Sequence, residues 1–470
     1  MSLADLSATE LLSKYRDRSL SPVEVIEDVL GRVEQLEPQI CALYALDPAG
    51  AREAALASER RWLSGDPVGA LDGVPTTVKE NIATRGIPVP QGTAATELVP
   101  AAEDAPAAAR LRDAGAVIFS KTTMPEYGML SSGVSTFHHL TRNPWDLSKT
   151  AGGSSAGAAA AAAAGYGPLH IGTDIGGSVR LPAGWCGLVG LKPTHGRIAV
   201  GNPYPGRAIG PLTRTASDAA LALSVMTGYD PRDHTSLPIP SDSYEATVDG
   251  LRVALLLDAG VGLPVDPDVT AAVSAAAAVL EKGGAVVDLI DPIITREMLD
   301  GLDSFWRVRS AADIAALPED RRAKVLPETR SWVSTAGDLS GFDVFHGYSQ
   351  MGAMAAAVTT VFRSYDVILS PVAPITAFAA ELAYPTGDPS KPFEHIGFTV
   401  PYNMSAHPAT TVNVGWSASG LPIGAQVAVP HHQDLVALAL ASYLDSQQAE
   451  RRDWPTGSDG QLRRGDDTPR

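Results

Sequence analysis

Cysteine is nearly absent from this chain, with only Cys41 and Cys186 among 470 residues. Two cysteines so far apart do not form a disulfide framework, and neither lies in the spacing of a metal site. We therefore interpret both as buried free thiols, the usual state of unpaired cysteine. No cofactor motif is visible either, so we expect a protein that needs no cofactor and no metal.

Long hydrophobic runs and excess positive charge are also missing. The N-terminal stretch MSLADLSATELL has no basic segment followed by an apolar run, which argues against a secretory signal. The longest apolar stretch is a run of alanines, too short and too weakly hydrophobic to span a bilayer. A net charge of -17 argues against nucleic acid, whose phosphates require clustered Lys and Arg. We expect a cytoplasmic protein, a monomer or homodimer, with no membrane or nucleic-acid partner.

What is present is the composition of a soluble globular enzyme, with 45% hydrophobic and 19% charged residues. Short apolar runs alternate with helical patterns, which is typical of α/β proteins. The capping box of Ser7 and Glu10 predicts one helix start, and Ser21 with Pro22 predicts another. A further helix is expected at 268–282, and strands at 76–79, 116–121, 168–174, 250–258, 284–291 and near 366.

The stretch KTAGGSSAGAAAAAAAG, residues 149–165, suggests either a slack linker or a packed helix. Gly and Ser favour a linker, but alanine is the best helix former, so we expect a buried helix from Ala156 to Ala164. GSSAG also matches the G-x-S-x-G elbow with Ser155 as nucleophile. That elbow requires a buried strand before it, whereas the preceding residues contain Pro144 and Trp145, so we interpret the match as accidental.

A second cluster of glycine and serine follows the expected strand at 168–174. Its IGGS sequence, Ile175 to Ser178, places backbone N–H groups in succession, which is how an oxyanion hole is built from main chain. A plain Gly-Gly turn is the alternative. A third element is Lys79, which ends an expected strand and precedes Glu80 and Asn81.

Together these segments resemble the amidase signature family. The resemblance covers KEN at 79–81, TRNPWD at 141–146, GGSSAG at 152–157, GTDIGGSVRLPAGWCGLVGLKPT at 172–194 and FTVPYNMSAHPATTVNVGWSASGLPIGAQV at 398–427. It implies a Ser–cis-Ser–Lys unit with Ser178 as nucleophile, Ser154 as bridging serine and Lys79 as base. The family's spacings of 75 residues from Lys79 to Ser154 and 24 from Ser154 to Ser178 are kept.

The resemblance also implies the surroundings of that unit. It implies a cis Gly153–Ser154 peptide and an oxyanion hole from the N–H groups of Ile175, Gly176, Gly177 and Ser178. The supporting residues would be Ser155, Asp174 and Arg180. Lysine can act as a base only if burial lowers its pKa. We expect Glu80 to point away from Lys79, because neighbours in a strand face opposite sides. Ala156 and Glu80 are mild departures from the family pattern.

The implied fold is a single large α/β domain over residues 1–470, with a mixed, mostly parallel twisted sheet covered by helices on both faces. We expect the catalytic core at about 70–220 and a helical cap, inserted at about 296–350, that is rich in charge and aromatics. The polar segment 455–470 is expected to be a flexible tail.

The substrate pocket would include the loop YGMLSSG, which is small and apolar. We expect a small-molecule amide or carbamate substrate: an uncharged aryl or alkyl amide, an anilide, a carbamate (urethane) or an ester. No arginine pair stands out for a substrate carboxylate. The cap aromatics Phe305, Trp306, Phe342 and Tyr348 fit pocket or core equally well. The expected pocket residues are Gly128, Met129, Leu130, Ser131, Ser132 and Gly133.

Other functions fit less well. The glutaminase subunit of a tRNA-dependent amidotransferase shares the motifs, but Ile396 stands where that subunit has an aspartate for the glutamine ammonium. A silent scaffold protein would not need all three catalytic side chains. The pairs His138–His139 and His431–His432 lie in no triad motif and are interpreted as solvated. Glu80 and Glu126 could suggest glycosidase chemistry, but we interpret them as surface carboxylates.

Overall fold

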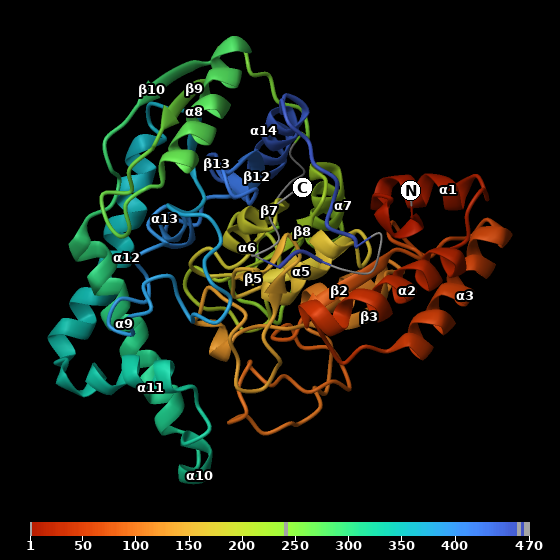
Figure 1. The fold of residues 1–470 in the computed structure, drawn as a ribbon, viewed down its shortest axis with the longest axis horizontal. Helices are drawn as coiled ribbons and strands as arrows, with labels where there is room; N and C mark the ends of the chain where they lie inside the picture. Colours follow the sequence, from red (N-terminus) through yellow and green to blue (C-terminus); the bar gives the residue numbers. More distant parts are fainter. Residues whose placement is uncertain (1, 239–242, 458–461, 465–470) are drawn as a thin grey trace.

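The computed structural model describes residues 2–238, 243–457 and 462–464, and a large mixed sheet runs through its centre (Figure 1). In these residues the sheet has eleven strands in the order β1-β3-β2-β6-β8-β7-β12-β13-β11-β9-β10. The strands are β1 (Leu43–Tyr44), β2 (Pro75–Lys79), β3 (Val117–Thr122), β6 (Leu169–Asp174), β7 (Val189–Lys192), β8 (Ala208–Thr213), β9 (Arg252–Leu255), β10 (Val286–Leu289), β11 (Val367–Pro371), β12 (Ala409–Trp416) and β13 (Pro422–Ala428), with β4 (Arg142–Asn143) and β5 (Asp146–Thr150) as a separate pair.

Parallel pairing occurs in two groups, β3-β2-β6 and β11-β9-β10, and the strands between them pair antiparallel. The expected α/β fold with a mixed sheet is confirmed. Because β2 and β6 are parallel neighbours, their carboxyl ends lie at the same edge of the sheet. Lys79 ends β2 and Asp174 ends β6. The sheet therefore brings two residues separated by about a hundred positions to one edge.

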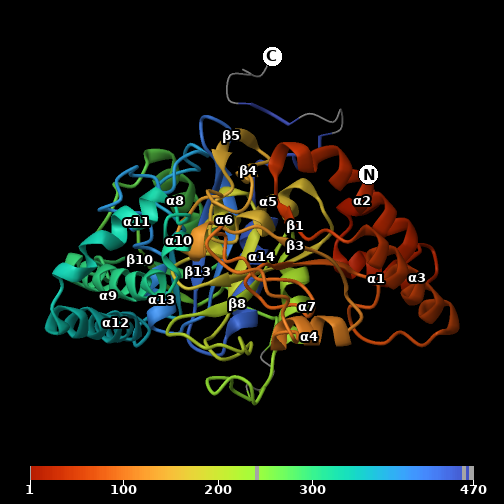
Figure 2. The same ribbon diagram turned by 90° about the horizontal axis from the view of Figure 1, so that it is seen from below.

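Helices cover both faces of the sheet and form a group at each end of the molecule (Figures 1 and 2). The capping boxes at Ser7 and Ser21 are both present, which confirms these two helix starts. The helices are α1 (Ala8–Arg16), α2 (Pro22–Ile40), α3 (Pro48–Ser64), α4 (Pro106–Asp113), α5 (Ala156–Ala164), α6 (Arg180–Trp185), α7 (Ala216–Met226), α8 (Pro267–Lys282), α9 (Arg296–Ala315), α10 (Glu319–Arg322), α11 (Pro327–Val333), α12 (Gly341–Val361), α13 (Val400–Met404) and α14 (Asp434–Ser446), with 3-10 turns at Leu3–Asp5, Glu126–Gly128 and Ser334–Asp338.

Helices α9 to α12 lie together at the end opposite α1 to α3 in both views (Figures 1 and 2). This helical segment continues to Val361, past the expected end at 350. Its aromatic residues divide between the interior and the surface. Trp306 is 5% exposed, whereas Phe342 is 89% exposed and belongs to neither the pocket nor the core. Phe305 packs edge-on against Tyr348, with ring centres 5.3 Å apart.

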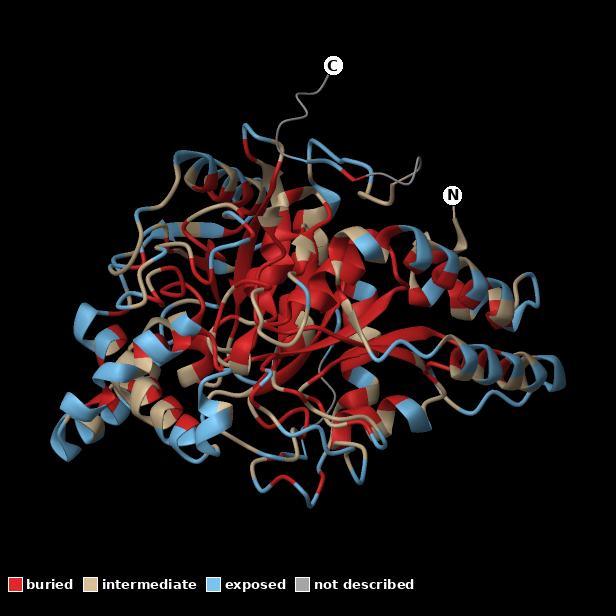
Figure 3. Ribbon diagram, turned by 60° about the horizontal axis from the view of Figure 1, so that its bottom comes forward, coloured by how far each residue is buried: buried red, intermediate tan, exposed pale blue. Residues whose placement is uncertain are grey.

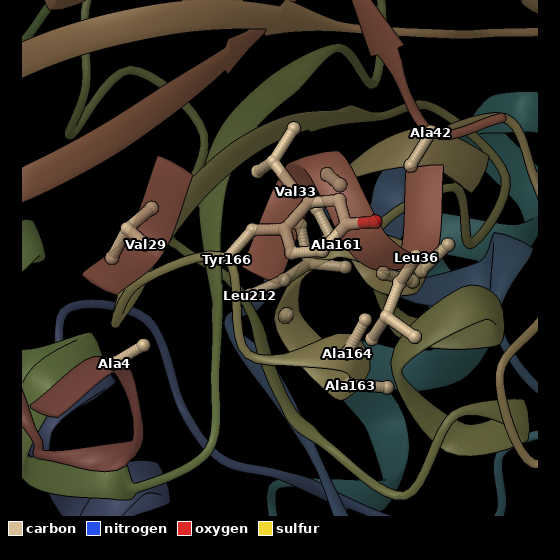
Figure 4. Packing of buried hydrophobic residues seen from close by; sticks show 14 of the residues in the cluster. Ala4, Val29, Val33, Leu36, Ala42, Ala161, Ala163, Ala164, Tyr166 and Leu212 are labelled. Carbon is tan, nitrogen blue, oxygen red and sulfur yellow. The ribbon is translucent and has the colours of Figure 1, made fainter. Parts of the chain in front are cut away.

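The alanine run forms α5, and all of its residues are buried. Buried residues are concentrated in the middle of the molecule (Figure 3). Figure 4 shows side chains of α2, among them Val29, Val33 and Leu36, gathered with Ala161, Tyr166 and other residues of this cluster. Alanine leaves the helix surface smooth, so neighbouring elements approach closely. A methyl group at Gly157 would overlap the carbonyl oxygen of Ala42. The packed-helix interpretation is confirmed.

A flexible tail is expected at the C-terminus, and the structure describes part of that segment. Leu462 is 9% exposed and packs on the α2–α5 core, and Leu147 N–H donates to the Arg463 carbonyl at 2.9 Å. These residues of the expected tail therefore contact the rest of the protein; 458–461 and 465–470 lie outside the described chain. Cys186 is a buried free thiol as expected, but Cys41 is only half-buried. Among the described helices, none is long and apolar enough to cross a membrane.

Candidate active site

Lys79 lies at the end of β2 with its side chain entirely buried. Its Nζ is 2.9 Å from Ser154 Oγ, 3.1 Å from Ser155 Oγ and 3.0 Å from Thr173 Oγ1. Thr173 comes from β6, the parallel neighbour of β2, and also accepts a hydrogen bond from Asn81 Nδ2. Three hydroxyl oxygens therefore surround the amine.

Burial lowers the pKa of Lys79 to about 7, against the opposing charges of Glu80 and Asp174, which raise it. The positive charge of Arg207 lowers it further. An ammonium ion surrounded by hydroxyls has lost much of its hydration, so the neutral amine gains in relative stability. Near neutral pH a substantial fraction of Lys79 can therefore accept a proton.

The surroundings of Glu80 correct the expectation of surface carboxylates at Glu80 and Glu126 and the expectation of a solvated His138. Its carboxylate is buried and lies 2.5 Å from His138 Nε2, so it is no surface group, and His138 is no solvated residue. Glu126 is also buried, and its carboxylate accepts hydrogen bonds from Thr136 Oγ1 and Leu326 N–H. Glu80 makes its hydrogen bond to His138, yet its charge still raises the pKa of Lys79.

Replacing Glu80 with glutamine is therefore expected to lower the pKa of Lys79. The amide keeps a polar partner for His138 but removes the negative charge that favours the ammonium ion. The acidic limb of kcat/KM against pH should move to lower pH, as measured with an amide substrate. Glu97→Gln, at a carboxylate that is 74% exposed, should leave the limb in place. A limb that stays still or moves to higher pH in Glu80→Gln would contradict this electrostatic account.

Ser154 and Ser155 lie just before α5, on the loop that contains the cis Gly153–Ser154 peptide implied by the resemblance. Ser154 is 3% exposed, and Gly128 approaches it so closely that a methyl group there would lie 3.3 Å from Ser154 Oγ. Ser155 donates its hydroxyl to the Thr173 carbonyl and its N–H to the Ser178 carbonyl. Ser155 thus links the loops of Lys79, Thr173 and Ser178, which agrees with our dismissal of the nucleophile elbow.

Ser178 is half-buried and lines the same pocket as Ser154. Asp174 holds the loop Ile175–Ser178 that ends at this serine. Its carboxylate accepts hydrogen bonds from Gly177 N–H at 2.9 Å and from Val179 N–H at 3.0 Å. The N–H of Gly177 is therefore already engaged, which corrects its expected place in the oxyanion hole. Gly177 has φ of +123°, and a side chain there would collide with Thr399.

Arg180 and Asp174 form a buried ion pair behind this loop, with Nη2 to Oδ1 at 2.9 Å. Burial alone would raise the pKa of Asp174, but the Arg180 charge and several hydrogen bonds lower it overall. Arg180 also donates to Gln426 Oε1, Asn403 Oδ1 and the Thr399 carbonyl. Sequence reasoning did not single out these three partners or Thr173. Thr399, Asn403 and Gln426 all lie in segment 398–427, so the family resemblance of that segment was the sequence signal that could have identified them.

Replacing Arg180 with leucine is expected to destabilise the protein by about 3–5 kcal/mol, because a buried Asp174 carboxylate is left without its counter-ion. Urea unfolding followed by fluorescence or circular dichroism measures this change. The control Arg52→Gln removes an ion pair with Glu27 that is half-exposed on both sides, and little change is expected there. Equal stability of Arg180→Leu and the parent protein would show that the pair does not hold this loop.

The pocket next to the two serines is lined by polar and apolar side chains in similar number and has a free volume of about 80 Å³. Typical ligand sites have roughly 300–1,000 Å³, so a bound amide requires some lining side chains to move. Ser132 and Gly133 do not line it, which corrects the expectation; they pack against Gly153 and Thr141. The lining residues are Asn81, Gln91, Tyr127, Gly128, Met129, Leu130, Ser131, Ser154, Thr173, Ile175, Gly176, Ser178, Leu181, Arg207, Trp306, Arg309, Phe393 and Ile396.

Two features of this lining matter for specificity. Ile396 lies in the pocket, so the position where the glutaminase of an amidotransferase would have its acid is apolar here. Arg207 and Arg309 also lie in the pocket, which corrects the expectation that no arginine pair stands near the substrate. Arg309 comes from α9, about a hundred residues beyond Arg207. Among the described residues, no cluster of His, Cys, Asp or Glu is arranged to hold a metal ion.

Comparison with known proteins agrees with this architecture. The family model described as Amidase matches residues 24–438. The chain is 35% identical to an acylamidase of Rhodococcus erythropolis, over 94% of this chain and 95% of the relative. It is 32% identical to one of the subunits of glutamyl-tRNA(Gln) amidotransferase from Bdellovibrio bacteriovorus, over 95% of this chain and 97% of that relative.

Comparison with a solved structure shows that the fold is shared as well. The chain superposes on the crystal structure of a bacterial aryl acylamidase of the amidase signature family with a TM-score of 0.87 at 29% identity, covering 96% of this chain and 98% of that one. The family match, the relatives and the shared fold all span nearly the whole chain. The chain therefore belongs to the Amidase family and is an amide-hydrolysing enzyme.

Proposed function

We propose that this enzyme hydrolyses the C–N bond of aryl or alkyl amides through an acyl intermediate on Ser178. The observation that carries the proposal is the position of Lys79, whose buried amine has a pKa of about 7 and lies 2.9 Å from Ser154 Oγ. Ser154 and Ser178 line one pocket. A serine hydroxyl needs a base to become a nucleophile, and a neutral lysine reached through a second serine supplies one.

The proposed reaction has two halves. Ser178 Oγ attacks the amide carbonyl while its proton passes to Ser154, whose own proton passes to Lys79. The backbone N–H groups of Ile175, Gly176 and Ser178 are the donors left to receive the negative oxygen. The proton then returns through Ser154 to the departing amine, and the C–N bond breaks to leave the acyl group on Ser178. Water hydrolyses the acyl-enzyme by the same proton path, which releases the acid and restores Ser178.

The pocket lining supports an apolar group beside the scissile bond. Met129, Leu181 and Trp306 are apolar or aromatic and lie in the same pocket as the two serines. Such surfaces favour aryl and alkyl groups, because burying apolar area is the main contribution to their binding. Carbamates and esters present a similar carbonyl to Ser178 and belong to the proposed substrate range.

The glutaminase activity of a tRNA-dependent amidotransferase is the second candidate, because several relatives are named as part of such an enzyme. Free glutamine carries an ammonium group that needs an acidic partner. Ile396, at the position where the resemblance places that acid, lies in the pocket and is 3% exposed. The apolar side chain would leave the ammonium without a counter-ion, so amide hydrolysis independent of tRNA is favoured.

The two candidates are separated by a substrate panel with the purified chain alone. We expect turnover of acetyl 4-nitroanilide, an alkyl amide and a carbamate without tRNA or other protein chains, followed by released amine. Glutamine should be hydrolysed at least tenfold more slowly, measured as released glutamate. Rapid glutaminase activity with no anilide turnover would favour the amidotransferase function instead.

A further inference from the structure

Two arginines face the pocket that holds Ser154 and Ser178. Arg207 lies just before β8, at the end of a loop, and Arg309 lies on α9. Both guanidinium groups stack on the ring of Tyr204, with Cζ to ring centre distances of 5.6 Å and 5.0 Å. Tyr204 therefore positions both cations, which come from distant parts of the chain, at the same pocket.

The two cations have few counter-charges. The described residues that line the pocket include no aspartate or glutamate. Beside Arg309 lies the carboxylate of Asp313, whose Oδ2 is 3.9 Å from Arg309 Nε and whose side chain is 61% exposed. No ion pair within 4.0 Å is found for Arg207 among the described residues; its Nη1 donates to the Asn202 carbonyl. This pocket is thus positively charged in a protein whose net charge is -17.

The N–H donors of Arg309 also lack strong hydrogen-bond acceptors. Its Nη2 reaches the Met129 sulfur at 3.2 Å, and thioether sulfur is a weak acceptor. Its Nε is buried without a hydrogen-bond partner. A half-buried guanidinium that lacks acceptors costs free energy, and a carboxylate supplies two acceptors to the N–H groups along the edge of the guanidinium. The arrangement has the chemistry of a site prepared for a carboxylate.

We propose that the enzyme prefers amides that carry a carboxylate away from the scissile bond, held by Arg207 and Arg309. This rests on the proposed function and names its substrate class more closely. The apolar side chains contact the group beside the carbonyl, while the two arginines bind the anionic end. The expectation of an uncharged substrate, drawn from the small apolar loop at 128–133, then describes only the part of the pocket nearest Ser178.

The test compares two anilides of equal chain length, glutaric acid mono-4-nitroanilide and pentanoic acid 4-nitroanilide. In low salt we expect kcat/KM to favour the carboxylate substrate by about tenfold or more, because charge-assisted hydrogen bonds are the strong ones. Arg207→Gln and Arg309→Gln should each reduce this ratio by about tenfold, and Arg309→Lys should retain part of it. Arg363→Gln, an exposed arginine outside the pocket, should leave the ratio within about twofold.

Calorimetric titration of both anilides into the Ser178→Ala protein measures affinity without turnover, so the outcome does not depend on either compound being cleaved. Tighter binding of the carboxylate compound, lost in the arginine variants, supports the proposal. Equal affinities and equal kcat/KM, or a preference that both glutamine variants keep, overturn it. These results leave the proposed function standing, whereas anilide turnover that survives in Ser178→Ala contradicts the function itself.

Discussion

Ser178→Ala is expected to lower kcat for an amide on the order of 10⁴- to 10⁶-fold, the size of effect seen when a serine hydrolase loses its nucleophile. No acyl-enzyme can form without the Ser178 oxygen, and water attack in the intact oxyanion loop supplies only residual catalysis. The fold should persist, because Ser178 is half-buried and the Asp174–Arg180 pair still holds the loop. Release of 4-nitroaniline, together with a thermal melting curve, measures both quantities.

The matched control is Ser131→Ala, which removes another serine hydroxyl from the same pocket. Because Ser131 has no part in the proposed proton path, its replacement should cost less than about tenfold in kcat. A Ser178→Ala protein that melts normally and keeps more than about a thousandth of the parent rate would show that another group attacks the carbonyl.

Lys79→Met is expected to depress kcat/KM by several orders of magnitude and to remove the acidic limb of the pH profile. Only the neutral amine accepts the proton, so the parent rate should fall as pH decreases through about 7, where Lys79 becomes protonated. Methionine fills a similar volume but takes no proton. Initial rates between pH 5 and 10 on the parent and the variant measure the limb.

Lys192→Met is the matched control, because Lys192 is also buried and burial lowers its pKa to about 7 as well. Its Nζ donates to the Pro193 carbonyl, and it does not line the pocket of Ser154 and Ser178. Its replacement should leave the limb near pH 7. A limb that disappears in Lys192→Met but persists in Lys79→Met would show that Lys79 is not the base.

The same comparison shows why a lowered pKa does not identify the base. Lys121 is a third buried lysine whose pKa falls to about 7, again because of burial. Its amine donates to Thr84 Oγ1 and to the Ile82 carbonyl, not to a serine hydroxyl. Among these three lysines, the contact with Ser154 distinguishes Lys79.

The roles proposed for Lys79, Ser154 and Ser178 came from the resemblance to the amidase signature family, whereas the elements that carry them could be predicted from local sequence patterns. Lys79 ends a strand, α5 follows the serine loop, and the glycines of IGGS precede Ser178, so each motif carries its own geometry. The alanine run could be assigned to the core because its residues have both the helix propensity and the small size that close packing needs.

The features that could not be predicted depend on long-range packing. Arg309 reaches the pocket only because α9 folds back over it, and no local pattern links Arg309 with Arg207. Glu80 was interpreted as a surface group from its charge alone, whereas His138, 58 positions away, gives it a buried partner. Leu462 packs into the hydrophobic cluster formed by α2 and α5, a contact between residues that lie far apart in the sequence.

The most direct test of the central claim is the identity of the serine that becomes covalently modified. The protein is treated with a fluorophosphonate at pH 8 and digested, and the peptides are mapped by tandem mass spectrometry. We predict a single adduct on Ser178, formed much more slowly in Lys79→Met than in Lys192→Met. An adduct on Ser155, or labelling of Ser178 at the same rate in both variants, would contradict the Ser178–Ser154–Lys79 assignment.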